Sequence, residues 1–249
     1  MHYNWSWHVF LAPSPDGEGT YLYLLLLGLV VTLITAMAAW IVAFAMGCVI
    51  GTARTLPLRS VRYTAGCYVE IFRNIPLLVQ MFIWYFVVPE LVPQQFGVWL
   101  KSMPEASFVT AVVALGFYTS SSVAVQVAAG INARPRGQTM ASMALGLTLS
   151  QTYRYVVLPM ALRTIIPSLA NDLTSTIKNT SVALTIGLLE LTARAKAMQE
   201  FSFHVFEAYS AAAVGYVLIN LIVVNMMRGL ERKVAVPGFM GGPDHMSPQ

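Results

Sequence analysis

The residues best suited to bind a polar ligand form a run between positions 171 and 181, where only Leu173 and Ile177 are apolar. If the run is helical, one stripe of its surface carries Asn171, Thr174, Ser175 and Lys178. The adjacent stripe carries Asp172, Thr176 and Asn179. Such a helix cannot face lipid, so the run either lines a hydrated passage, which we favour, or packs against a partner protein. Lys178 then attracts a carboxylate substrate or simply pairs with a nearby acid.

A second polar group precedes this run. Glu70 and Arg73 are three residues apart, so they can form an ion pair on one face of a helix. Charges within a membrane usually face the protein interior or water. The pair therefore either lines a passage or is a structural ion pair that fixes its helix against neighbouring helices at the membrane surface. Pro76 removes a backbone hydrogen bond and predicts a kink. Together with Gln80, the predicted passage residues are Glu70, Arg73, Gln80, Asn171, Thr174, Ser175, Lys178 and Ser181.

The sequence shows none of the local motifs of energy conversion or catalysis. It has no GxxxxGK[ST] phosphate loop, so we expect ATP and Mg²⁺ to be bound by a partner chain and not by this one. The histidines are scattered, and no Cys/His cluster has metal-ligand spacing. We therefore predict no catalytic residue and no metal ligand. An intramembrane enzyme built on the polar run and an ion-coupled secondary carrier stay as alternatives.

Composition predicts a membrane protein. Hydrophobic residues make up 57% of the 249 positions and charged residues only 10%, whereas soluble domains average about 25% charged residues. Several uncharged stretches approach or exceed the roughly 20 residues that cross a bilayer as a helix. They predict an all-α membrane protein with about five transmembrane helices, at residues 21–50, 64–88, 106–132, 160–189 and 204–229.

The basic residues predict the orientation of the chain. Nine of the fifteen Lys and Arg residues follow the first, third and fifth spans, namely Arg54, Arg59, Arg62, Arg134, Arg136, Arg154, Arg228, Arg232 and Lys233. The opposite loops carry mainly acids, with Lys101, Arg194 and Lys196 as a basic minority. By the positive-inside rule the regions after the first, third and fifth spans are cytoplasmic. The net charge of +4 is therefore a topology signal, and we expect no nucleic-acid partner. Residues 1–19 are then an extracytoplasmic segment, and residues 234–249 form a disordered cytoplasmic tail.

The loop between the third and fourth spans is unusually apolar. Pro135 and Gly137 end the incoming helix. From Gln138 onward, apolar residues recur at helical spacing at Met140, Met143, Ala144 and Leu147. The other side of the predicted helix, over residues 138–151, carries Ala141, Leu145 and Leu149. A helix of this kind must pack against its own spans, lie in the lipid interface or fill a groove on a partner.

Several ordered motifs resemble the permease subunits of bacterial ABC importers. The loop motif comprises Gly137, Gln138, Met140, Ala141, Ser142, Ala144, Leu145 and Gly146, followed by Leu158, Pro159 and Pro167. Further matches are the segment 70–80 and Asn171 with the segment 178–181. Together they are most similar to the polar amino-acid branch of the family, and within it to glutamate/aspartate importers. The resemblance covers residues 20–233, and it implies that they form an importer transmembrane domain.

The resemblance implies how such a chain works. The loop from Gly137 would be a cytoplasmic coupling helix that sits in a cleft of an ATP-binding subunit, so that closure of the ATPase dimer moves the spans. The expected partners are that dimer, a second permease subunit, identical or homologous, and an extracytoplasmic substrate-binding protein. The expected function is import of a polar amino acid, glutamate or aspartate by similarity, across the bacterial inner membrane by alternating access.

Two departures from the family pattern concern the site. Met140, Ala141 and Ser142 stand where the loop commonly has Glu-Ala-Ala, so a contact made by that Glu is absent. In the third span, Val125 and Ala128 stand where the family commonly has a Glu and an Arg. One consequence we expect is that this subunit contributes less to the substrate pathway than its partner permease.

Overall fold

The computed structural model describes residues 3, 5–14, 17, 19–133 and 136–234. Within these residues the chain is helical, and the extended pairing is limited to an isolated antiparallel bridge between Pro13 and Thr20. The predicted all-α fold is therefore confirmed. The predicted tail lies outside the described residues from position 235 onward.

The described part of the chain folds into a series of α-helices joined by short turns. The α-helices are α1 (Tyr21–Ala53), α2 (Arg59–Asn74), α3 (Leu77–Phe82), α4 (Val88–Leu91), α5 (Gln94–Ser102), α6 (Ala106–Asn132), α7 (Arg136–Ala144), α8 (Leu149–Thr152), α9 (Leu158–Asn179), α10 (Leu191–Ser202) and α11 (Val205–Val234). The 3-10 helices are η1 (Trp7–Leu11) and η4 (Thr180–Ile186). The π-helical segments are η2 (Ile83–Val87) and η3 (Tyr153–Val157).

Among the described residues, four helical stretches are long and apolar enough to cross a membrane. They are α1, α6, the continuous stretch Leu149–Ile186 and α11. Helix α2 and the stretch Leu77–Leu91, which are bent by 103° relative to each other, form a fifth crossing if the pair is counted as one span. These crossings agree with the prediction of about five spans, and α6 has the bounds that the sequence predicts.

The second span was predicted as one kinked helix over residues 64–88. The structure instead divides it before Pro76, because a residue that precedes proline avoids the helical region, and Ile75 is extended (φ −91°, ψ 125°). Gln80 is buried in α3 and donates from Nε2 to the carbonyls of Phe72 and Ile75, at 2.7 and 2.9 Å. It thereby satisfies carbonyl groups that the break leaves without a helical partner.

The fourth span begins earlier than its predicted start at residue 160. Helical structure begins at Leu149, where the side chains of Thr148 and Gln151 form a reciprocal capping box. Hydropathy misses these first turns because they carry polar residues and Arg154, which is exposed.

Two segments predicted as loops contain helices. The outer loop at residues 89–105 includes α5, and the connection before the last span includes α10. The N-terminus of α10 is capped by Glu190, whose buried carboxylate accepts hydrogen bonds from the backbone N–H groups of Thr192 and Ala193 at 3.0 and 2.8 Å. A short-range cap of this kind gives no apolar pattern, so hydropathy does not predict it.

Helices α1 and α6 pack closely through small residues. A Cβ atom added to Gly47 of α1 would lie 2.5 Å from the Cβ of Val123 in α6, and one added to Gly51 would lie 2.6 Å from the carbonyl oxygen of Ala124. Ala39 and Ala43 on the same helix are fully buried. Small side chains let two membrane helices approach closely, so this pair forms the centre of the bundle.

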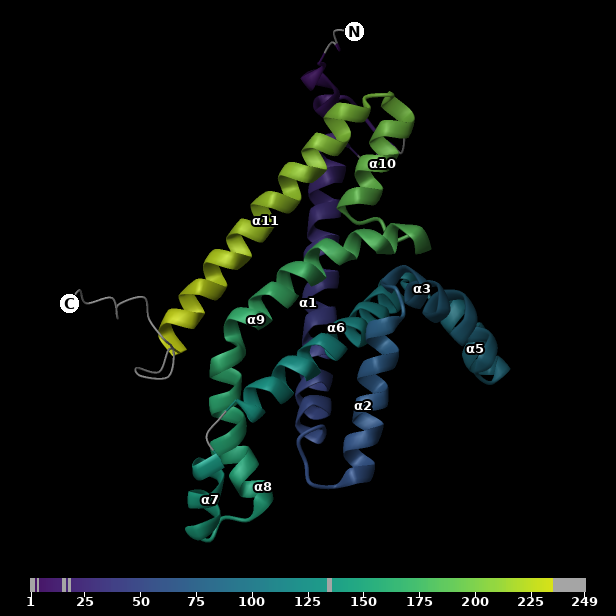
Figure 1. Ribbon diagram of the computed structural model, residues 1–249. Coiled ribbons are helices and arrows are strands. Elements are labelled where there is room, and N and C mark those ends of the chain that lie inside the picture. The colour runs from purple at the N-terminus through teal and green to yellow at the C-terminus, as the bar shows by residue number, and fades with distance from the viewer. Residues whose placement is uncertain (1–2, 4, 15–16, 18, 134–135, 235–249) are drawn as a thin grey trace, which may run out of the picture.

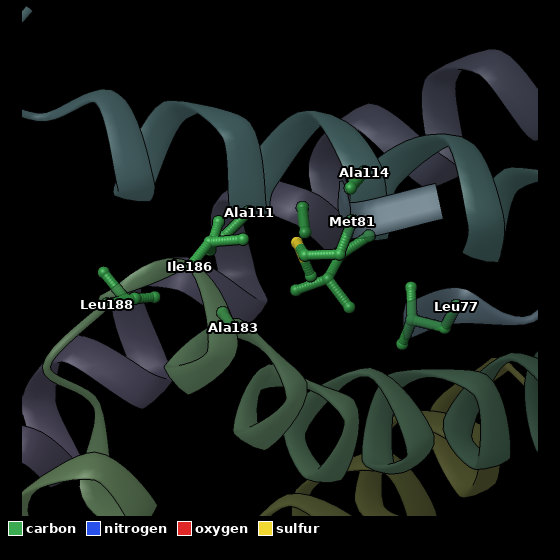
Figure 2. Packing of buried hydrophobic residues seen from close by; sticks show 9 residues of the cluster. Leu77, Met81, Ala111, Ala114, Ala183, Ile186 and Leu188 are labelled. Atoms are coloured by element: carbon green, nitrogen blue, oxygen red, sulfur yellow. The ribbon is translucent and has the colours of Figure 1, made fainter. Parts of the chain in front are cut away.

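A buried cluster ties the broken second span to the rest of the bundle (Figure 2). Met81 of α3 is fully buried, and it belongs to the same cluster as Ala111 and Ala114 of α6 and Ala183 of η4. The cluster holds α3 against the start of α6 and the end of the fourth span.

Several connections between helices lie at two opposite ends of the bundle. Helices α7 and α8 lie at the same end as the connection between α1 and α2, whereas η1 and α10 lie at the other end (Figure 1). Helix α11 runs obliquely along the side of the bundle. It exposes a row of apolar side chains suited to lipid, namely Val214, Val217, Leu218, Leu221 and Ile222.

Candidate functional site

A polar cleft of about 440 Å³ lies between α2, α6 and α9. It is lined by Arg73, Tyr118, Thr119, Ser121, Ser122, Asp172, Ser175 and Asn179. The cleft combines one cation, one carboxylate, hydroxyl groups and a carboxamide. Such a set suits a small ligand that carries both charges, and this makes the cleft the candidate site for a transported solute.

Only part of the predicted passage set reaches this cleft. Arg73 and Ser175 line it. Thr174 and Ser181 instead donate from their hydroxyls to helix carbonyls, those of Asn171 and Lys178, at 2.9 and 2.7 Å. The remaining members that do not line the cleft are Glu70, Gln80, Asn171 and Lys178, and Gln80 serves the break in the second span.

The predicted ion pair between Glu70 and Arg73 does not form. Glu70 accepts a hydrogen bond from Asn74 Nδ2 at 3.2 Å. Among the residues that the structure describes, Arg73 has neither an ion pair nor a hydrogen bond, and its side chain is exposed. Its guanidinium is therefore available to an anionic group in the cleft.

Asp172 supplies the negative charge of the cleft from α9. Its two carboxylate oxygens accept hydrogen bonds from Ser122 Oγ at 3.1 Å and Gln126 Nε2 at 2.7 Å, both on α6. One turn away, the hydroxyls of Thr119 and Thr176 are 3.2 Å apart. These contacts fix α9 against α6 and hold the carboxylate at the cleft wall, where it can bind an ammonium group.

Sequence reasoning missed most of the α6 contribution. The hydroxyl residues from Tyr118 to Ser122 lie in the third span and are not among the predicted passage residues. Ser120 and Ser121 do bond within the bundle, to the carbonyls of Phe117 and Tyr118, but the same turn also lines the cleft. Sequence reasoning also left out Asp172 and Asn179 of α9, which line the cleft. The signal for these two residues was their position on the polar stripe beside the one that we assigned to the passage.

The two departures in the third span lie at packed positions of α6. Ala128 is buried, and Val125 is half-buried. Neither lines the polar cleft, whose α6 wall ends at Ser122. The absence of charges at these two positions is therefore compatible with the cleft described above.

The apolar loop forms a short exposed helix, α7. Met140 is 70% exposed, Met143 50% and Leu145 85%. Ser142 is buried and donates to the carbonyls of Gln138 and Thr139 at 2.9 and 3.0 Å. The chain's own spans therefore leave most of the apolar surface of α7 uncovered.

The helix in this loop is shorter than predicted. We expected helical structure over residues 138–151, but α7 ends at Ala144, because Gly146 adopts φ +86°, which favours glycine. Leu147 therefore does not continue the apolar face. The other predicted coupling residues lie on α7 or at its end, with Gly137, Ala141, Ala144 and Leu145 all exposed.

The described residues contain no group of three or more His, Cys, Asp or Glu side chains that could hold a metal ion. Cys48 and Cys67 are free and partly buried.

Comparison with known proteins gives the class of the chain. Residues 43–236 match the family described as the inner membrane component of binding-protein-dependent transport systems. Because the match spans most of the 249 residues, the chain belongs to this family.

Its relatives are amino-acid permeases. The chain is 42% identical to the glutamate/aspartate import permease protein GltJ of Escherichia coli K12. The alignment of 245 residues covers 97% of this chain and 100% of GltJ. It is 31% identical to the glutamine transport system permease protein GlnP of the same strain, over 77% of this chain and 84% of GlnP. A crystal structure of an amino acid ABC transporter with histidines matches with a TM-score of 0.73 and 30% identity, over 86% of this chain and 95% of that chain. The chain is thus a multi-pass inner-membrane permease subunit of an ABC importer for amino acids.

Proposed function

We propose that this chain forms one transmembrane half of an ATP-driven importer that moves glutamate or aspartate into the cell by alternating access. A dimer of ATP-binding subunits, which holds ATP and Mg²⁺, supplies the energy. A second permease subunit, identical or homologous, and an extracytoplasmic binding protein complete the assembly. The N-terminus faces the outside, and α7 and the C-terminus face the cytoplasm.

The uncovered apolar surface of α7 is the observation that carries this proposal. Exposed Met140 and Leu145 have no energetic reason to face water. A cleft on an ATP-binding subunit would cover this surface, as an apolar helix in a groove does in many complexes. Movement of that cleft would then act through α8 and η3 on α9, which carries Asp172 and Ser175 at the polar cleft.

The polar cleft supports an amino acid as the solute. The Arg73 guanidinium suits a carboxylate, and the Asp172 carboxylate suits an ammonium group. An acidic amino acid carries two carboxylates and one ammonium group. The 42% identity to a glutamate/aspartate import permease supports that choice within the amino acids.

The coupling role of α7 is tested with Met140→Arg. Burying an unpaired charge in the proposed ATPase cleft costs several kcal/mol. We expect the ATP-binding subunit to be lost on co-purification, and ATP-driven glutamate uptake into proteoliposomes to fall to background. The matched control is Leu58→Arg, which changes an exposed leucine outside α7 (59% exposed) and should retain both properties.

Two outcomes would contradict the proposal. Retention of ATPase binding and uptake by Met140→Arg would show that α7 is not the coupling element. Accumulation of glutamate by this chain alone under an ion gradient would favour the carrier alternative, because the proposal requires the ATPase, the second permease and the binding protein together.

A further inference from the structure

A second cavity, separate from the polar cleft, lies on the outer surface of the bundle between α1, α9 and α11. It has a volume of about 350 Å³. Its walls are apolar, with Trp40 and Phe44 from α1, Leu162 and Ile166 from α9, and Met227 and Leu230 from α11. We call this cavity the α1–α9–α11 groove.

One cation, Arg163 of α9, lies at the edge of this groove. Its side chain is exposed, and among the described residues it makes neither an ion pair nor a hydrogen bond. The nearest acid along α9, Asp172, is engaged by Ser122 and Gln126 and lines the polar cleft instead. A cation in a membrane-spanning helix is costly unless a partner compensates it, so an occupant of the groove should supply an anion.

The depth of the groove follows from the end of α11. Leu230 and Val234, in the last turns of that helix, line the same groove as Arg163. These turns carry Arg228, Arg232 and Lys233 beside the single acid Glu231, so their net charge is positive. With the orientation proposed above, Arg163 lies near the cytoplasmic membrane surface, where anionic lipids attract basic residues.

The apolar part of the groove adjoins exposed apolar faces of α1 and α11. Next to the groove, Ile41 and Met226 are 65% and 69% exposed, as expected for faces that contact lipid. The groove therefore combines a cation that is unpaired among the described residues with an apolar channel beside faces that contact lipid.

We propose that the α1–α9–α11 groove binds an anionic phospholipid of the cytoplasmic leaflet. Arg163 binds the phosphate, Lys233 adds positive charge near the headgroup, and one acyl chain lies along Trp40, Phe44 and Ile166. Such a lipid joins α11, which has few buried residues, to α1 and α9.

The proposal is tested by photocrosslinking in the full complex with its partner subunits. The complex is reconstituted in phosphatidylcholine vesicles that contain a trace of either phosphatidylglycerol or phosphatidylcholine, each with a diazirine midway along one acyl chain. After illumination, mass spectrometry measures the labelling of peptides that contain Trp40, Phe44 and Ile166. We expect phosphatidylglycerol to label these peptides about fivefold more than phosphatidylcholine does.

Three variants identify the role of the cation. Arg163→Gln should reduce the ratio to about one, and Arg163→Lys should retain most of it because the charge stays. The matched control, Arg59→Gln, removes a cation at the start of α2, outside the groove, and should leave the ratio unchanged.

Equal labelling by the two lipids in the unmodified complex, or an unchanged ratio in Arg163→Gln, would overturn the proposal. Absence of label from the groove would also overturn it, and would indicate that a partner subunit or residues 235–249 cover the groove. The readout needs no transport, so it does not depend on whether the proposed substrate is correct.

Discussion

At the residue scale, the two cations predicted for the passage occupy different environments. Helix α9 buries Leu173, Thr176 and Ile177 against the bundle, and this fixes its rotation about its own axis. Asp172, Ser175 and Asn179, at positions i, i+3 and i+7, consequently face the cleft. Lys178 is exposed outside the cleft, and the cation that lines it is Arg73 of α2.

The first prediction compares these two cations. Arg73→Gln removes the charge-assisted hydrogen bonds that we expect a substrate carboxylate to accept, which are worth about 1.5–3 kcal/mol. The apparent KM for glutamate in ATP-driven uptake should rise about tenfold or more. Lys178→Gln is the matched control and should change the KM less than threefold. A larger effect at Lys178 than at Arg73 would place the carboxylate site outside the polar cleft.

The sequence predicts the polar character of the site better than its geometry. Helical periodicity places Asp172 and Ser175 on neighbouring stripes, but it does not say which stripe faces the cleft. That choice depends on packing against α6, where hydroxyls such as Ser122 serve both the cleft and the helix contact. A Ser or Thr in a membrane helix looks the same in sequence in either role, because its hydroxyl can also bond to a carbonyl of its own helix.

At the element scale, the broken second span shows where hydropathy is least informative. The span at 106–132 was predicted with the observed bounds because Glu105 precedes it and the first charge after it is Arg134. Helix α2 is amphipathic, so hydropathy finds only its later turns. Pro76 predicts a kink, but the 103° bend also needs a donor for the released carbonyls, and Gln80 provides it.

The second prediction concerns this donor. Gln80→Leu leaves the carbonyls of Phe72 and Ile75 without their side-chain partner, and an unsatisfied buried acceptor costs about 1–3 kcal/mol. The loss should lie toward the lower end, because the substitution also removes the buried Gln80 Oε1, which has no partner among the described residues. Denaturation of the purified chain in mixed micelles measures the change in the free energy of unfolding.

The control for this experiment is Gln95→Leu, which makes the same substitution at an exposed position of α5. It should change the free energy of unfolding by less than about 0.5 kcal/mol. Equal stability of the two variants would mean that Gln80 does not stabilise the break, and that packing of Met81 in its buried cluster is sufficient.

At the scale of the whole molecule, the fold groups the regions that the charge pattern assigns to one side of the membrane. The connection between α1 and α2 carries Arg54, with Arg59 at the start of α2, and it lies at the same end of the bundle as α7 (Figure 1). These regions are far apart in the sequence, and the arrangement of the helices brings them to one end of the bundle, which the positive-inside rule predicts to be cytoplasmic. The segment with η1 lies at the opposite end, as expected for an extracytoplasmic N-terminus.

The last prediction tests this orientation in the intact membrane. In a background with Cys48 and Cys67 replaced, single cysteines are introduced at Ser60, Gly137 and Gln95, all of which are exposed. A membrane-impermeant thiol reagent should label Gln95→Cys in intact spheroplasts, because α5 belongs to the outer loop. It should label Ser60→Cys and Gly137→Cys only after the membrane is opened, because both lie at the end that carries the basic residues.

Labelling of Gly137→Cys from outside would place α7 on the side without ATP, and the proposed coupling to an ATPase would then be impossible. Labelling of all three cysteines from outside would instead indicate leaky membranes, which a cytoplasmic marker enzyme in the supernatant would reveal.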